Sequence, residues 1–296
     1  MARLSGSSSG RLMGITTTRR PITKVIGSTW DERSDAIAVE SPLTIVLDGE
    51  VLVTTMRTPG HDLELAAGWL VNESGVRRSS DIIGMGAFAT AAREIDEQAE
   101  EAPAEEPVID TVRLRLQDGV APPRPRAFVT TSACGVCSAD VLAAFTGPTA
   151  PLHTDGWRLP AGRVHALLDQ MRAEQRMFDQ TGSLHAAGLA GPTLECLWVR
   201  EDVGRHNAVD KVIGKALFED SLPLTDHVLV VSGRVSYEIV HKALTASIAG
   251  IIAVSGPTSL AVDLARQHGL ILIGFARDDR MNIYCGAERI DQGAAT

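Results

Sequence analysis

The stretch VLVVSGRVSYEIVHKALTASIAGIIAVSGPTSLAVDLARQHGLILIGF, residues 228–275, decides the fold because it repeats one pattern. Its apolar runs have the unbroken composition of strands buried on both faces, and they cover residues 228–231, 251–254 and 270–275. The segments between them have helical spacing, and they cover residues 237–247 and 260–268. This β-α-β-α-β order predicts a parallel sheet with helices on its faces.

The rest of the chain has mixed patterns. A hairpin is predicted around Asp48-Gly49, within residues 37–53, and Asp62 is expected to cap the helix that follows. The further predicted elements are a helix over residues 63–72, a strand over 108–116, a helix over 163–178, a strand over 193–199 and a helix over 207–218.

We therefore expect an α/β protein with two domains. A smaller N-terminal α+β domain covers residues 21–150 and an α/β cofactor-binding domain covers residues 151–296. Residues 1–20 are rich in Ser, Gly and Arg without the apolar centre of a secretory signal, so we expect a disordered leader.

Composition limits the possible functions. The chain has 296 residues, of which 44% are apolar and 22% are charged, as in ordinary soluble proteins. No apolar run approaches the roughly 20 residues that cross a bilayer, so we expect a cytoplasmic protein without a membrane partner. Residues 94–106 contain seven acidic and no basic residues, which accounts for most of the net charge of −9. We interpret residues 94–107 as a solvated insertion and expect no nucleic-acid partner.

The predicted parallel sheet defines a candidate ligand site. Loops that leave parallel strands emerge at one edge, and the loops here cover residues 232–236, 255–259 and 276–282. Glycines allow a ligand to approach the backbone closely, and the guanidinium groups of arginines match phosphate groups. We therefore expect a ligand that contains phosphate. The candidate residues are Ser232, Gly233, Arg234, Gly256, Arg277 and Arg280. Neither a GxGxxG motif nor a P-loop is present, and simple strand-to-helix turns remain the alternative.

A second polar cluster covers residues 200–211, between an apolar strand and an amphipathic helix. Its candidate site residues are Asp202, His206, Asn207 and Lys211, and a solvated loop is the alternative interpretation. His185 is flanked by small residues, and by itself it is more typical of a structural histidine than of a catalytic one.

Cys134 and Cys137 form a CxxC pair, which can bind metal, exchange disulfides or transfer a group through a thiolate. A zinc site needs four ligands, but Cys196 and Cys285 are single and distant, so we expect no permanently bound metal. A thioredoxin-like site would follow the first strand of a βαβ unit, whereas this pair lies about 90 residues before the clear parallel sheet. Group transfer by an activated thiolate fits best, and disulfide exchange stays open.

Several motifs together resemble the formate dehydrogenase accessory sulfurtransferase family, FdhD. The resemblance runs from about residue 42 to residue 290. Its motifs are RTPGHDLELA at 57–66, TSACGVC at 131–137, TGSLHAA at 181–187, REDVGRHNAVDK at 200–211, SGR at 232–234, PTSLA at 257–261 and NIY at 282–284. Ser138 and Ser183 depart from the family pattern, because each occupies a position where glycine is usual.

The resemblance implies a sulfur carrier. Such proteins accept persulfide sulfur from a cysteine desulfurase and pass it to the molybdenum bis(molybdopterin guanine dinucleotide) cofactor before that cofactor enters formate dehydrogenase. Cys134 would carry the persulfide and Cys137 would assist. The implied cofactor-contacting residues are Phe275, Ala276, Arg277, Asp278, Asp279 and Arg280, beside Ser232, Gly233, Arg234 and His206. The family also suggests a homodimer.

The family core resembles the three-layer cytidine-deaminase fold, which we expect for the C-terminal domain. Zinc deaminases need a histidine followed two residues later by glutamate, and His185-Ala186-Ala187 lacks that glutamate. Zinc deamination is therefore not expected. The alternatives to a sulfur carrier are a non-catalytic chaperone that binds the molybdenum cofactor and a thiol-disulfide oxidoreductase.

Overall fold

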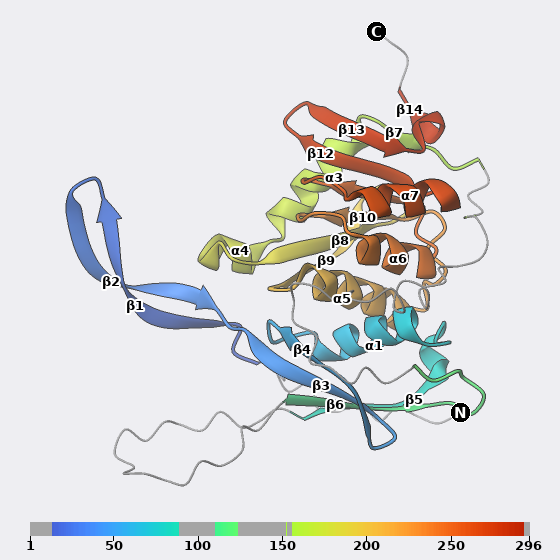
Figure 1. Cartoon of the computed structure of the whole chain (residues 1–296), viewed down its shortest axis with the longest axis horizontal. Coiled ribbons are helices and arrows are strands. Elements are labelled where there is room, and N and C mark those ends of the chain that lie inside the picture. Colours follow the sequence, from blue (N-terminus) through green and yellow to red (C-terminus); the bar gives the residue numbers. More distant parts are fainter. Residues whose placement is uncertain (1–13, 89–109, 124–151, 153–155, 293–296) are drawn as a thin grey trace.

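The computed structural model describes residues 14–88, 110–123, 152 and 156–292. These residues form a mixed α/β structure in which helices lie between a four-stranded and a six-stranded sheet (Figure 1). The CxxC pair and the acidic insertion predicted over residues 94–107 lie outside the described residues.

The six-stranded sheet has the order β13-β12-β11-β10-β8-β9. Its strands are β8 (His185–Ala190), β9 (Cys196–Asp202), β10 (Val228–Val231), β11 (Gly250–Ala253), β12 (Ile271–Arg277) and β13 (Arg280–Cys285). β10, β11 and β12 are parallel and are joined through α6 (Tyr237–Thr245) and α7 (Ser259–His268), so the β-α-β-α-β prediction is confirmed. β8, β9 and β13 flank this trio in antiparallel pairings that the sequence pattern did not predict.

Helices cover both faces of this sheet. Leu229 and Val231 point into the larger core with α5 (Arg205–Phe218), α6 and α7, whereas Val228 and Val230 point into a smaller core with α3 (Arg163–Ala173). The alternation explains why β10 is apolar at every position. The helix-sheet-helix layering is thus observed, while the cytidine-deaminase likeness remains a prediction.

The N-terminal layer is a four-stranded sheet of order β4-β3-β6-β5, covered by α1 (Asp62–Glu73). Its strands are β3 (Ser41–Leu47), β4 (Glu50–Arg57), β5 (Ile82–Phe88) and β6 (Asp110–Leu116). The predicted hairpin is confirmed, because Asp48 and Gly49 have φ angles of 49° and 93° in the tight turn between β3 and β4. Short elements complete the fold: η1 (Ser79–Asp81), η2 (Ala287–Arg289), β7 (Leu159–Pro160) and β14 (Ile290–Asp291).

The two layers meet where α1 crosses α5 at backbone distance. A β-carbon on Gly68 would lie 1.8 Å from the carbonyl oxygen of Asp210, and one on Gly214 would lie 1.8 Å from that of Glu64. Only glycine allows this approach. The larger apolar core is therefore continuous from the four-stranded sheet to the six-stranded sheet, on both sides of the predicted domain boundary at residue 150.

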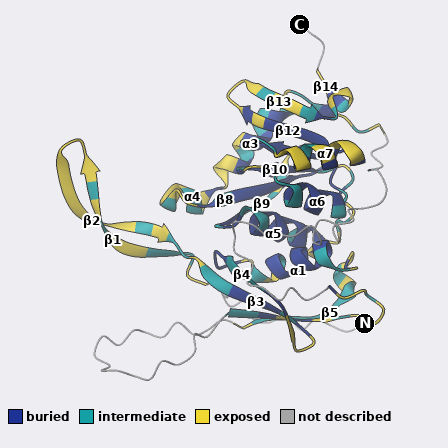
Figure 2. Ribbon diagram, in the orientation of Figure 1, coloured by how far each residue is buried: buried dark blue, intermediate teal, exposed yellow. Residues whose placement is uncertain are grey.

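A long hairpin of β1 (Thr17–Ile26) and β2 (Thr29–Ala38) projects from the body and is largely exposed (Figures 1 and 2). Residues 17–20 belong to β1, which corrects the prediction of a disordered leader over residues 1–20; residues 1–13 lie outside the described range. The strands stay together through ten cross-strand pairs, including the opposite charges of Arg20 and Asp35. This hairpin was missed because apolar residues do not alternate regularly along it.

Three local predictions need correction. The helix expected over residues 163–178 breaks into α3 and α4 (Arg176–Thr181), because the buried Glu201 carboxylate accepts the Met177 and Phe178 amides at 2.9 and 2.8 Å. The strand expected over residues 193–199 begins only at Cys196. Asp62 is the first residue of α1 rather than its cap. None of the helices in the described ranges is long and apolar enough to cross a membrane.

We predict that Gly214→Ala lowers the free energy of unfolding by at least about 2 kcal/mol, because the new methyl group must push two helix backbones apart. Urea denaturation followed by circular dichroism measures this change. Gly162→Ala is the matched control, since its backbone is right-handed and no heavy atom lies within 4 Å of the added carbon. Equal effects of the two substitutions would contradict the packing explanation.

Candidate functional site

The candidate site lies at the edge of the six-stranded sheet where β10, β11 and β12 end. The loops over residues 232–236 and 255–259 leave this edge and lead into α6 and α7, as predicted. They run side by side because Val235 forms a parallel bridge with Pro257, and the Thr258 amide donates to the Val235 carbonyl at 2.9 Å. The loops over residues 232–236 and 255–259, each of which contains a glycine, therefore form one continuous rim at this edge of the sheet.

The third predicted loop, over residues 276–282, is a β-hairpin. β12 continues to Arg277, and β13 returns from Arg280 after a turn at Asp278-Asp279. Asp278 has a φ of 56°, a left-handed conformation that aspartate tolerates better than most residues. Arg277 and Arg280 are cross-strand partners and both are exposed, so two positive charges lie together at the tip.

Phe275 and Ala276 precede this tip and have different environments. Phe275 has a φ of 51°, its side chain is 40% exposed, and its ring rests on Gly256, where a β-carbon would lie 2.6 Å from the ring. An exposed aromatic ring on a strained backbone is a feature that accumulates at functional sites. Ala276 is buried in the smaller core, so only its backbone is available to a ligand.

The Ser232-Gly233-Arg234 turn lies against the start of β8. The Ser232 hydroxyl accepts the Ala186 amide at 2.9 Å and thereby ties the turn to that strand. A β-carbon on Gly233 would lie 3.1 Å from Nδ1 of His185, so the imidazole rests on the glycine. Burial lowers the pKa of His185, and the positive charges of Arg205 and Arg234 lower that pKa further, although Asp202 opposes them.

His206 is tied to the first turn of α6. Its Nε2 lies 3.1 Å from Oγ of Ser236 and 3.0 Å from Oε2 of Glu238. Burial lowers the pKa of His206 to about 3, with further contributions from Arg205, Lys242 and His185. The imidazole is therefore neutral, and its hydrogen bond joins α5 to α6 at the rim.

The other polar residues predicted for the 200–211 cluster form a buried network below the rim. Asp202 and Lys211 are fully buried and lie 2.7 Å apart. The Asp202 carboxylate also accepts the Thr58 and Gly204 amides, and Asn207 donates to it at 3.1 Å. The side chains of Asp202, Asn207 and Lys211 are therefore buried and have internal partners, which excludes the solvated-loop interpretation, and the hypothesis that they line a site stays a prediction.

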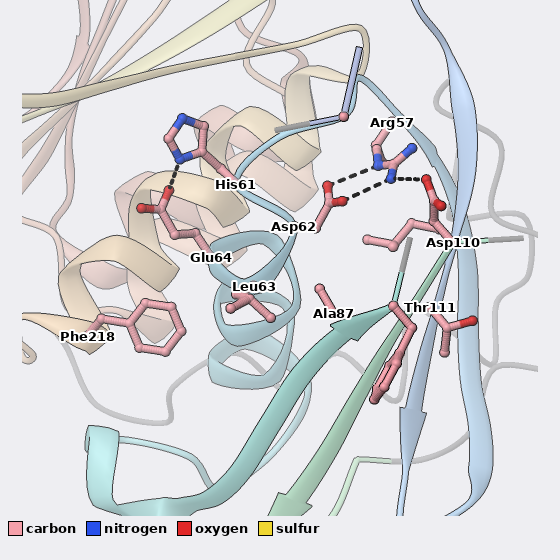
Figure 3. A pocket seen from close by; sticks show the side chains of 12 residues that line it. Arg57, His61, Asp62, Leu63, Glu64, Ala87, Asp110, Thr111 and Phe218 are labelled. Atoms are coloured by element: carbon pink, nitrogen blue, oxygen red, sulfur yellow. Dashed lines mark hydrogen bonds and ion pairs between the residues drawn. The ribbon is translucent and has the colours of Figure 1, made fainter. Parts of the chain in front are cut away.

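A separate cavity of about 380 Å³ lies between α1 and the four-stranded sheet. Figure 3 shows Arg57 between Asp62 and Asp110, with guanidinium-to-carboxylate distances of 2.9 and 2.7 Å, and His61 near Glu64. None of the ligand residues predicted from the sequence lines this cavity. Its charged groups are paired with one another, so the sheet edge remains the candidate site.

Two residues of the edge were missed as ligand candidates. Arg205 lies inside the motif over residues 200–211, where Asp202, His206, Asn207 and Lys211 were chosen as candidates instead. His185 was interpreted as structural because a histidine without other candidate site residues beside it is more often structural than catalytic. The signal for both is topological. β8 is antiparallel to β10 and β9 is antiparallel to β8, so the start of β8 with His185 and the end of β9, which leads into α5, both lie at the edge where the parallel strands end.

Fold and site together define a mixed α/β protein with a polar, arginine-bearing rim at the carboxyl ends of parallel strands. The family model of the FdhD/NarQ family matches residues 38–291. The chain belongs to this family, as its sequence motifs indicated.

Similar proteins support the same conclusion. The chain is 43% identical to the sulfur carrier protein FdhD of Nocardia farcinica over 280 residues, which cover 94% of this chain and 96% of that protein. It is 36% identical to the protein of the same name from Saccharolobus solfataricus over 281 residues, covering 94% and 100%. The crystal structure of a protein assigned as a formate dehydrogenase accessory protein from Desulfotalea psychrophila has a TM-score of 0.71, with 22% identity, and covers 93% of this chain and 100% of that chain. This last likeness concerns the fold.

We predict that the Glu64–Arg200 ion pair, which joins α1 to β9, makes the free energy of unfolding fall at acidic pH. Burial alone would raise the pKa of Glu64, but hydrogen bonds from Arg200 and His61 lower it to about 2. The pair therefore stabilises the fold above about pH 4.5, and its contribution of about 2 kcal/mol is lost as the pH falls from there towards 2.

Urea denaturation of wild type and Glu64→Gln across pH 2 to 6 tests this expectation. The stability difference between them should be largest at pH 6 and should disappear at the acid end. Glu219→Gln is the control, because its i,i+4 pair with Lys215 is half exposed on the glutamate side and contributes little. A difference between wild type and Glu64→Gln that does not change with pH would contradict the expectation.

Proposed function

We propose that this protein is a sulfur carrier that takes sulfur from a cysteine desulfurase and delivers it to the molybdenum bis(molybdopterin guanine dinucleotide) cofactor before formate dehydrogenase receives it. One observation carries the proposal: a chain with the Cys134/Cys137 pair also has a rim suited to nucleotide phosphates, in a family whose curated relatives are named sulfur carriers. A cytoplasmic location and a homodimer belong to the same proposal.

The acceptance step is a sulfurtransferase reaction on Cys134. The Cys134 thiolate attacks the outer sulfur of the desulfurase persulfide, so a sulfur–sulfur bond forms on Cys134 while the desulfurase bond breaks. The desulfurase cysteine leaves as a thiolate, and no net oxidation occurs. Both cysteines of the pair lie outside the described residues, and the step rests on their spacing and family.

The delivery step needs two electrons, which Cys137 supplies together with Cys134. The Cys137 thiolate attacks Sγ of Cys134, a disulfide forms between the two, and hydrosulfide leaves toward the bound cofactor. The sulfane sulfur is reduced as the two thiols are oxidised, and an external dithiol restores the pair. This gives Cys137 its assisting role.

The rim residues suit the guanine nucleotide part of the cofactor. Phe275 offers an exposed ring for a base, while Gly233 and Gly256 allow close approach to the backbone. Ser232, Arg234 and residues 275–280 surround this position, and neutral His206 supports the rim from below. When bound, the cofactor supplies the metal that receives the sulfur.

We predict that incubation with a cysteine desulfurase and cysteine adds 32 Da to the peptide that contains Cys134, because one sulfur atom is transferred. Mass spectrometry of the intact chain and its peptides measures this addition, and Cys134→Ala should abolish it. Cys196→Ala is the control that should retain it, because burial raises the pKa of the Cys196 thiol to about 11 and disfavours its thiolate.

A wild-type chain that gains no sulfur would favour a non-catalytic cofactor chaperone. Turnover of a generic disulfide substrate that requires both cysteines equally would favour a thiol-disulfide oxidoreductase. Either result contradicts the carrier proposal.

We predict that Arg277→Ala/Arg280→Ala weakens GDP binding several-fold, because it removes two exposed positive charges from the tip of the β12–β13 hairpin. Isothermal titration calorimetry measures the affinity. Arg266→Gln, on the exposed last turn of α7 at the opposite end of the sheet, should leave it unchanged. Unchanged GDP affinity in the double variant would remove these arginines from the site.

A further inference from the structure

The β1–β2 hairpin stands apart from the body of the molecule as an exposed arm (Figures 1 and 2). In the described ranges its two strands form a sheet by themselves, and β2 also contacts α4. Ten residues per strand, at about 3.4 Å each, give an arm of roughly 34 Å. A two-stranded hairpin is only marginally stable in water, so an arm of this length gains stability from contacts beyond its own.

The tip of this arm, residues 25–30, is apolar and exposed. Val25, Ile26 and Trp30 are 48%, 67% and 74% exposed, and residues 25–30 include no charged residue. Val25 and Trp30 are cross-strand partners, so their side chains lie on one face of the hairpin. The strands behind the tip carry charges at Arg19, Arg20, Lys24, Asp31, Glu32, Arg33 and Asp35. An apolar end on a charged arm indicates a protein contact, in which tryptophan is enriched among the anchoring residues.

The cavity between α1 and the four-stranded sheet suits such an anchor. Its volume of about 380 Å³ is in the range of pockets that enclose small organic groups, and Leu63, Ala87 and Phe218 line it together (Figure 3). Leu63 and Phe218 are 36% and 37% exposed, so the cavity opens to the surface. Its charged groups are paired with one another, which favours an uncharged ring over an ion. The carboxylates of Asp62 and Glu64 can still accept an indole N–H, because each oxygen has two lone pairs.

The tip lies too far from the cavity of its own chain to enter it. Gly14 and Leu43 line that cavity, and they flank the arm in the sequence. The foot of the arm is closed by a hydrogen bond from the Val39 amide to the Thr16 carbonyl at 2.9 Å. The tip is therefore about one arm's length from the cavity beside its foot. Across a twofold axis, the same length brings each tip to the cavity of the other copy, and the assembly closes as a dimer.

We propose that Trp30 of each copy inserts into the cavity between α1 and the four-stranded sheet of a second copy. The inference rests on the proposed function, whose homodimer it specifies. The cavity thereby gains an indole ring as its ligand, and the arm becomes an exchanged anchor. Residues 57–66, a motif to which the sulfur chemistry gives no role, supply Arg57, His61, Asp62, Leu63 and Glu64 to the cavity.

Sedimentation equilibrium of the full chain tests the arm. Wild type should form a dimer, and Trp30→Ala should raise its dissociation constant at least about tenfold, because the anchor is lost. Val51→Ala is the matched control, since Val51 is 59% exposed beside the turn between β3 and β4 but belongs to the body of the molecule. It should leave the dissociation constant unchanged. Circular dichroism should stay native in both variants, because neither side chain is buried.

A complementation experiment tests the cavity. Leu63→Lys places a charge in the cavity and leaves the arm intact, so it should weaken the dimer as Trp30→Ala does. A mixture of the two variants should form a heterodimer that is tighter than either variant homodimer. The reason is that Trp30 of the Leu63→Lys chain meets the intact cavity of the Trp30→Ala chain, which restores one of the two contacts. Fluorescence anisotropy of one labelled chain measures this association.

The outcomes are distinguishable. A monomeric wild type overturns this contact and the proposed homodimer, but not the sulfur carrier, since persulfide formation on Cys134 is measured separately. A dimer that Trp30→Ala leaves intact, or that Val51→Ala weakens equally, overturns the anchor. A dimer that Leu63→Lys leaves intact, or a mixture no tighter than the variant homodimers, overturns the cavity as the receiving site.

Discussion

The buried ion pair between Asp202 and Lys211 is the interaction on which the arrangement of the rim depends. Two charges removed from water cost several kcal/mol unless their remaining hydrogen-bonding capacity is satisfied. Here that capacity is satisfied by backbone groups of distant segments: Thr58 contributes its amide to Asp202 and its carbonyl to Lys211. The pair thus joins the residue after β4 and the end of β9 to the middle of α5, where Lys211 lies, while the Asp202 carboxylate also accepts the Gly204 amide just before α5.

The helix contact at Gly68 and Gly214 complements this ion pair. The glycines bring α1 so close to α5 that the two backbones are in contact. The Asp202 carboxylate holds the start of α5 through the Gly204 amide and Asn207, and the ion pair with Lys211 and the glycine contact hold the middle of the helix. A rim built on the first residues of α5 is therefore positioned by the N-terminal layer, although no residue of that layer belongs to the proposed nucleotide site.

The sequence predicted the parallel unit well because its signal is local. Each strand is a short apolar run, and the edge position of Ser232, Gly233 and Arg234 follows from strand direction alone. Which strands pair is set by contacts between distant segments, so the places of β8 and β9 beside β10, and with them the position of His185, could not be derived from periodicity. The roles of Asp202 and Lys211 were likewise ambiguous, because the sequence does not distinguish a charged group that faces a ligand from one that has partners inside the protein.

The rim carries several arginines although the chain as a whole is acidic. The net charge is −9, but the charge of the buried Asp202 carboxylate below the rim is compensated by the Lys211 ammonium. If Lys211 were lost, Asp202 would retain an uncompensated charge that already opposes the arginines at His185. The local potential would then shift toward negative. The buried network below the rim therefore has two inseparable effects: it joins the two layers through Thr58, and it compensates the charge of Asp202 beside the arginines of the rim.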